Sequence, residues 1–254
     1  MVPFIALTLF LFLLLPGRLF AYNEDGRIHL EAGFEVLNRD IEEESTVFQG
    51  LIFPKEKPSA QSLRLLAKLS VRIIDPIELY AVAGGSDLEL TGSGFDYSSD
   101  FSGAYGGGAR LILFRENSAE MPYQVFADYR FLRFKTHDTT LFFPTDAGLG
   151  VPVGNTGELL NEKIQWNEHL LKLGIMGRHD EFEPYGGIRF SLVRGKDFLP
   201  SQFQELHIKF KQSDTFGVFF GTSYYLSRSD KAALFIEASL FDQNSLAGGI
   251  RVGF

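Results

Sequence analysis

Apolar and polar residues alternate with a period of two along most of the chain. Between residues 28 and 37, the even positions are apolar, and nearly all the odd ones are polar or glycine. Successive side chains of a β-strand point to opposite faces, whereas a helix would repeat every 3.6 residues. The same alternation recurs in runs over residues 65–74, 77–83, 103–115, 123–132, 171–176, 185–192, 216–224, 234–240 and 246–254. The sequence therefore predicts an all-β protein of about ten strands.

The connections between these runs alternate between short polar turns and mostly longer loops. This asymmetry is typical of a closed, antiparallel up-and-down transmembrane β-barrel with short periplasmic turns and longer extracellular loops. An even strand count returns both chain ends to one side. Eight or twelve strands remain possible, because residues 203–211 also alternate and fit either a strand extension or a further hairpin arm.

The chain begins with an apolar run at residues 3–15, followed by Pro16, Gly17 and, four residues later, Ala21. A membrane-spanning helix needs about 20 apolar residues, so this shorter run is typical of a secretory signal peptide. We expect residues 1–21 to be a signal peptide cleaved near Ala21, and residues 22–254 to form one barrel domain.

Composition narrows the possible functions. The net charge of −8 argues against a nucleic-acid partner. The absence of cysteine excludes disulfides and thiolate metal sites. The 26 Phe, 9 Tyr and 26 Gly suit aromatic-rich strands with close packing. The tripeptide at 106–108 is explained by such packing, since it lacks the lysine and helix of a phosphate-binding loop.

The polar face and the strand ends favour a membrane barrel over a soluble one. A narrow lumen filled by ion pairs would explain charges of both signs on the polar face, namely Glu31, Lys68, Arg72, Arg110, Asp128, Arg130, Arg189, Glu237 and Arg251. Aromatic residues on the apolar face recur near strand ends, as in the two interfacial girdles of membrane barrels. These are Tyr123, Tyr224 and Phe254 on the short-turn side and Tyr105 and Phe131 on the loop side. A soluble barrel with the opposite orientation is the alternative.

The last five residues place Ile250, Val252 and Phe254 on one face of the final strand. This ending resembles that of bacterial outer-membrane β-barrel proteins, and the whole mature chain resembles the small OmpA-like and OmpX-like barrels. The resemblance implies an outer-membrane location, with Ile250, Val252 and Phe254 as an assembly signal. It also implies the barrel assembly machinery and periplasmic chaperones as partners during biogenesis, and outer-membrane lipid thereafter.

The chain lacks the side-chain patterns of known outer-membrane enzymes. The lipid A deacylases carry a His-x-Ser pair, which is absent, and the omptin proteases carry Asp-x-His, whereas this chain has His137 followed by Asp138. Adjacent strand residues face opposite ways, so this pair is poorly suited to activate one water. The five histidines show no metal-site spacing, and the acidic run at 42–44 is interpreted as solvated, although it could hold a divalent cation. We expect no catalytic residues, metal or cofactor.

Basic residues follow the apolar positions at the loop side of three consecutive strands: Arg133, Lys135, Lys163, Arg194 and Lys196. If the strands are neighbours, these cations form a patch at the level of lipopolysaccharide phosphates. The alternative is a rim that is merely solvated. Our leading hypothesis is a monomeric structural or interaction barrel with a filled lumen. A small channel is second, and an enzyme acting on lipid or peptide is third.

Overall fold

The computed structural model describes residues 28–43, 47–48, 51–52, 57–92, 96–116, 122–138, 162–199, 206–226 and 231–254. The expected signal peptide lies outside them. The described secondary structure consists of β-strands. None of the described segments forms a helix long and apolar enough to cross a membrane.

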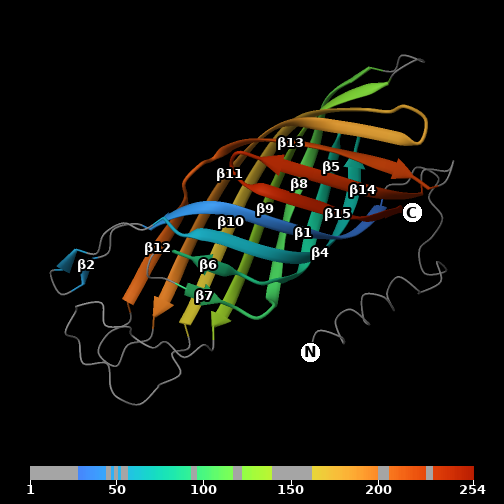
Figure 1. The fold of residues 1–254 in the computed structure, drawn as a ribbon. Coiled ribbons are helices and arrows are strands. Elements are labelled where there is room, and N and C mark those ends of the chain that lie inside the picture. The colour runs from blue at the N-terminus through green and yellow to red at the C-terminus, as the bar shows by residue number, and fades with distance from the viewer. Residues whose placement is uncertain are drawn as a thin grey trace.

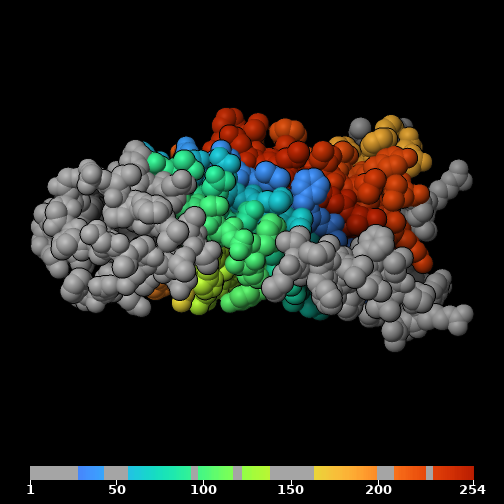
Figure 2. Space-filling model, turned by 60° about the horizontal axis from the view of Figure 1, so that its bottom comes forward, coloured from blue at the N-terminus to red at the C-terminus, as the bar shows by residue number. Residues whose placement is uncertain are grey.

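Ten antiparallel strands form a closed barrel, as predicted (Figure 1). Each pairs with the next, and the last pairs with the first over ten residues. Figure 2 shows the resulting contact between the blue surface of the first strand and the red surface of the last ones. The ten are β1 (Ile28–Glu43), β4 (Ser59–Ile74), β5 (Ile77–Ser86), β8 (Ser102–Glu116), β9 (Tyr123–Asp138), β10 (Glu162–Gly177), β11 (Phe182–Leu199), β13 (Phe216–Tyr225), β14 (Ala232–Leu240) and β15 (Asn244–Gly253).

The two ends of the barrel differ. β1 begins and β15 ends at the same end, where Phe254 N–H donates a hydrogen bond to the Ile28 carbonyl at 2.9 Å. We call this the terminal end. Its connections are short, such as the turn between β4 and β5 at residues 75–76. The opposite, loop end carries the longer connections, together with the short strands β2 (Val47–Phe48), β3 (Leu51–Ile52), β6 (Glu89–Thr91) and β7 (Asp96–Ser98).

The barrel wall is tall on one side and low on the other. β9, β10 and β11 contain 16 to 18 residues, whereas β13, β14 and β15 contain 9 or 10. Above the low side, β12 (Leu206–Gln212) fills the wall by pairing with both β11 and β1. The alternation within 206–211 therefore belongs to a further hairpin arm, one of the two possibilities that the sequence left open.

The apolar face of the strands points outward and the charged face points inward. Large apolar side chains such as Leu69, Ile175 and Phe220 are about half exposed on the outer face. Tyr105, Tyr123, Tyr224 and Phe254 are also exposed there, at the strand ends predicted. This orientation is the reverse of that in a soluble ligand-binding barrel.

Glycine lets neighbouring strands and rings approach closely. A Cβ at Gly106 would lie 2.0 Å from the carbonyl oxygen of Phe131, and one at Gly108 would lie 2.5 Å from the hydroxyl of Tyr80. Close packing thus accounts for the glycine run at 106–108.

Candidate functional site

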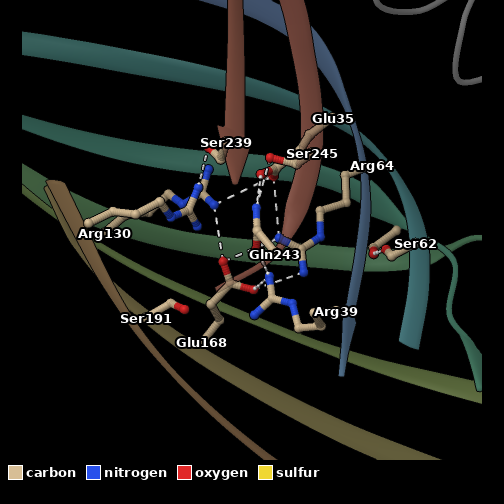
Figure 3. A network of polar contacts seen from close by, with 12 residues as sticks. Glu35, Arg39, Ser62, Arg64, Arg130, Glu168, Ser191, Ser239, Gln243 and Ser245 are labelled. Carbon is tan, nitrogen blue, oxygen red and sulfur yellow. Dashed lines mark hydrogen bonds and ion pairs between the residues drawn. The ribbon is translucent and has the colours of Figure 1, made fainter. Parts of the chain in front are cut away.

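A buried carboxylate at mid-barrel holds together side chains from four strands (Figure 3). Glu168 of β10 accepts hydrogen bonds from three guanidinium groups. The donors are Nη2 of Arg39 at 3.0 Å, Nη2 of Arg64 at 2.9 Å and Nη2 of Arg130 at 3.1 Å. The side chains of Glu168, Arg39 and Arg64 have no exposed surface. One carboxylate therefore ties β10 to β1, β4 and β9 across the lumen.

Glu35 and Gln243 complete this arrangement. Glu35 lies 3.3 Å from Nη1 of Arg64 and 3.5 Å from Nη2 of Arg130. Gln243 accepts a hydrogen bond from Arg39 and donates to Glu35 at 3.5 Å. We call Glu35, Arg39, Arg64, Arg130, Glu168 and Gln243 the ionic layer. Its three arginines face two carboxylates, so it carries one excess positive charge.

The turn between β14 and β15 bends into the lumen. Phe241 has a φ of 80° and is 72% exposed, whereas the next two residues, Asp242 and Gln243, are both buried. Asp242 Oδ2 lies 2.9 Å from Nε of Arg189 and accepts a hydrogen bond from Ser191 at 2.7 Å. The left-handed conformation at Phe241 breaks the strand alternation, so two successive polar side chains point inward.

The loop end of the lumen is filled by apolar side chains. Trp166 is 1% exposed and stacks on Phe134 with ring centroids 6.0 Å apart. We call the following buried set the apolar plug: Ile41, Ala60, Leu88, Leu90, Tyr97, Ala104, Leu132, Phe134, Ile164, Trp166, Val193 and Phe210. Among the described residues, the plug and the ionic layer occupy the lumen above mid-barrel.

A cavity of about 140 Å³, which we call the chamber, lies between the ionic layer and the terminal end. Its walls carry close ion pairs. Arg110 lies 2.9 Å from Asp128, Glu31 lies 3.2 Å from Lys68 and 3.0 Å from Arg251, and Lys172 pairs with Glu237. The lining of the chamber carries six basic and five acidic side chains, so the opposed charges nearly balance.

The structure brings eight of the nine sequence-predicted lumen charges together around the chamber: Glu31, Lys68, Arg110, Asp128, Arg130, Arg189, Glu237 and Arg251. The ninth, Arg72, lies at the terminal end, where its side chain is 39% exposed and 3.8 Å from Asp75. Sequence reasoning missed Arg39, Arg64 and Glu168. All three lie outside the alternating runs described above. Arg39 follows the run at 28–37, whereas Arg64 precedes the run at 65–74 and Glu168 precedes the run at 171–176.

The predicted basic residues lie on the outer face of three neighbouring strands. Arg133 of β9 and Arg194 of β11 are both in register with Asn167 of β10, and Lys135 and Lys196 are both in register with Gln165. Lys163 lies one row further toward the loop end. All are exposed except Arg133, which is half-buried. The five cations therefore share one surface.

β12 extends this surface with two cations that were not singled out from the sequence. Lys211 is in register with Arg194, and Lys209 with Lys196. The ammonium of Lys211 is 3.5 Å from Glu42 of β1, which also lies 3.4 Å from Lys57. We call the seven cations Arg133, Lys135, Lys163, Arg194, Lys196, Lys209 and Lys211 the basic rim.

The proposed assembly residues lie on the outer face of the last strand. Ile250 and Val252 of β15 pair with Ala32 and Leu30 of β1. Phe254 is 39% exposed at the terminal end.

The adjacent residues His137 and Asp138 are the last two of β9, at the loop end. His137 points outward in register with Lys163, while the side chain of Asp138 lies outside the described residues. The described part of the chain contains no group of three His, Asp or Glu residues placed to hold a metal ion. Of the acidic run, Glu42 pairs with lysines, and the side chains of the two residues after it lie outside the described set.

Comparison with known proteins identifies the fold. The sequence matches no protein-family model, and no curated protein resembles it in sequence. The outer membrane protease OmpT from Escherichia coli matches with a TM-score of 0.50 and 11% identity, over 93% of this chain and 99% of OmpT. The translocator domain of the autotransporter NalP from Neisseria meningitidis matches over 98% and 95%, with a TM-score of 0.41 and 11% identity. The Ralstonia pickettii toluene transporter TbuX matches over 89% of both chains, with a TM-score of 0.34 and 11% identity. The fold is that of the bacterial outer-membrane β-barrels.

Proposed function

We propose that the protein is an integral outer-membrane barrel of structural or interaction type, whose lumen is closed and whose basic rim binds lipopolysaccharide. The main support is that the outward apolar belt ends at the basic rim on adjacent strands. A continuous apolar belt around a barrel is suited to lipid and would be unfavourable in water.

The interior favours a closed barrel over an open channel. The ionic layer crosses the lumen with side chains from β1, β4, β9 and β10, and the apolar plug fills the space above it. A barrel of about eight strands is just filled by its side chains, and ten strands add only a little room. The chamber is therefore a blind pocket along the barrel axis.

The rim has the geometry to hold phosphate groups. Neighbouring strands are about 4.8 Å apart, and residues two positions apart on one strand are about 7 Å apart. The rim therefore presents a two-dimensional array of cations directly above the belt. Arg and Lys form charge-assisted hydrogen bonds with phosphate oxygens. In the proposal, lipopolysaccharide is an annular ligand of β9 to β12.

The test replaces Arg133, Lys135, Lys163, Arg194 and Lys196 with glutamine together. We expect less copurifying lipopolysaccharide and a smaller gain in thermal stability when lipopolysaccharide is added. Arg115→Gln with Lys231→Gln, which removes exposed cations at the terminal end, is the matched control and should retain both properties. If the variant with five substitutions bound as much lipopolysaccharide as the wild type and were stabilised by it equally, the rim would be merely solvated and the proposal would be wrong.

A further inference from the structure

Among the described residues, the barrel wall contains a place where side chains, and not a strand ladder, close the gap between two segments. Below the gap is the Phe241–Gln243 turn of the short β14–β15 hairpin. Above it, residues 213–215 cross from β1 to β11. There Ser213 N–H donates to the Asp40 carbonyl at 3.1 Å, and Ser191 N–H donates to the Thr215 carbonyl at 2.9 Å. The gap in the low side of the wall is therefore bordered below by the Phe241–Gln243 turn and above by residues 213–215.

Polar side chains seal the space between these borders. Gln212 donates from Nε2 to the Asp242 carbonyl at 2.9 Å, and its Oε1 lies 2.8 Å from the hydroxyl oxygen of Ser191. Arg39, at the junction of β1, β12 and the turn, contacts both Gln212 and Gln243. We call Arg39, Arg189, Ser191, Gln212, Asp242 and Gln243 the window seal; each is at most 5% exposed.

The seal lies next to the chamber. Arg189 belongs to the seal and also lines the chamber. Glu35, another lining residue, is contacted by Gln243. On the outside, the first residue of the turn, Phe241, is exposed at the loop-side border of the apolar belt. The window seal therefore lies between the chamber and the outer surface at this border.

We propose that the window seal is a gate, and that its opening connects the chamber laterally with the outside of the barrel as a port for water and small ions. Side-chain hydrogen bonds rearrange without breaking the backbone ladders that hold the barrel together. The apolar plug stays in place, so the path does not follow the barrel axis. This function goes beyond the closed barrel, which is the state with the seal intact.

The test measures potassium chloride conductance of purified variants in planar bilayers. Gln243→Ala removes three hydrogen-bond partners without changing the charge of the seal. Gly217→Ala displaces Asp242 by another route, because the added Cβ would lie 2.1 Å from Asp242 Oδ1. We expect the wild type to be nearly silent and open time to rise about five- to tenfold for each hydrogen bond lost. Both variants are first shown to fold by heat-dependent gel migration.

Two controls separate a lateral port from an axial pore. Trp166→Ala opens the apolar plug but leaves the seal intact, so it should remain as silent as the wild type. Because the chain lacks cysteine, Phe241→Cys can be combined with Gln243→Ala and modified with a quaternary-ammonium methanethiosulfonate, which should reduce the current. Folded Gln243→Ala and Gly217→Ala proteins that stay silent would overturn the proposal, as would a current that is insensitive to modification at position 241.

Discussion

Replacing Glu168 with glutamine perturbs the carboxylate that three arginines share inside the barrel. The substitution preserves the shape of the side chain but leaves Arg39, Arg64 and Arg130 with Glu35 as the remaining carboxylate of the ionic layer. Removing one partner from a buried ion pair typically costs about 3–5 kcal/mol, because the other charge stays buried and uncompensated. Since Glu168 has no exposed surface and serves three arginines, of which Arg39 and Arg64 are fully buried, we expect a loss toward the upper end of that range.

Urea unfolding of the barrel in lipid vesicles measures this loss. Trp166, the only tryptophan of the chain, is buried two residues from Glu168 and reports unfolding by its fluorescence. Glu237→Gln is the matched control. Its partner Lys172 and its own side chain are each nearly one-fifth exposed, so the cost should be smaller. Combining Glu168→Gln with Arg64→Met should recover part of the stability by removing one of the excess positive charges of the ionic layer. A Glu168→Gln loss below about 1 kcal/mol, or one equal to that of Glu237→Gln, would refute the reasoning.

Two further predictions concern assembly and packing. Phe254→Ser should lower the amount of barrel found in the membrane fraction, while the barrel that does insert should unfold at nearly the same urea concentration as the wild type. Insertion at the normal level would leave Phe254 as an ordinary aromatic residue of the girdle. Gly187→Ala should lower the free energy of unfolding by roughly 1–3 kcal/mol or more, because the added Cβ would lie 2.1 Å from the Leu173 carbonyl oxygen. Gly103→Ala is the control: a Cβ there would have nothing within 4 Å, so the free energy of unfolding should hardly change in the same assay. Equal effects of the two glycine substitutions would contradict this packing.

The period-two pattern predicted the closed barrel and the direction of its faces because each strand has one face toward the lumen. The same rule failed where the lumen itself is apolar. Leu132, Phe134 and Trp166 share the inward phase with Arg130 and Glu168. A local pattern that is apolar on both faces does not identify which residues plug a barrel. The apolar plug therefore emerged only from the three-dimensional structure.

The ionic layer and the window seal depend on contacts between distant parts of the chain. Arg39 meets Glu168, Gln212 and Gln243, which are 129 to 204 residues away in sequence. Nothing in a single strand indicates such partners. The inward turn at Phe241 was equally hidden, because positive φ is uncommon for a bulky residue and is normally supplied by glycine or asparagine. The basic residues of β9 to β11 were accessible from sequence because they follow the phase of the apolar belt.

The central claim, that the outer face of the barrel meets lipid, can be tested on one strand. Single cysteines at Leu171 and Leu173, which point outward, and at Leu170 and Lys172, which point inward, are labelled with bimane in this cysteine-free chain. Quenching is then measured in vesicles containing brominated phosphatidylcholine. We expect strong quenching at 171 and 173 and weak quenching at 170 and 172. Equal quenching at all four positions, or stronger quenching at the inward pair, would contradict the transmembrane barrel.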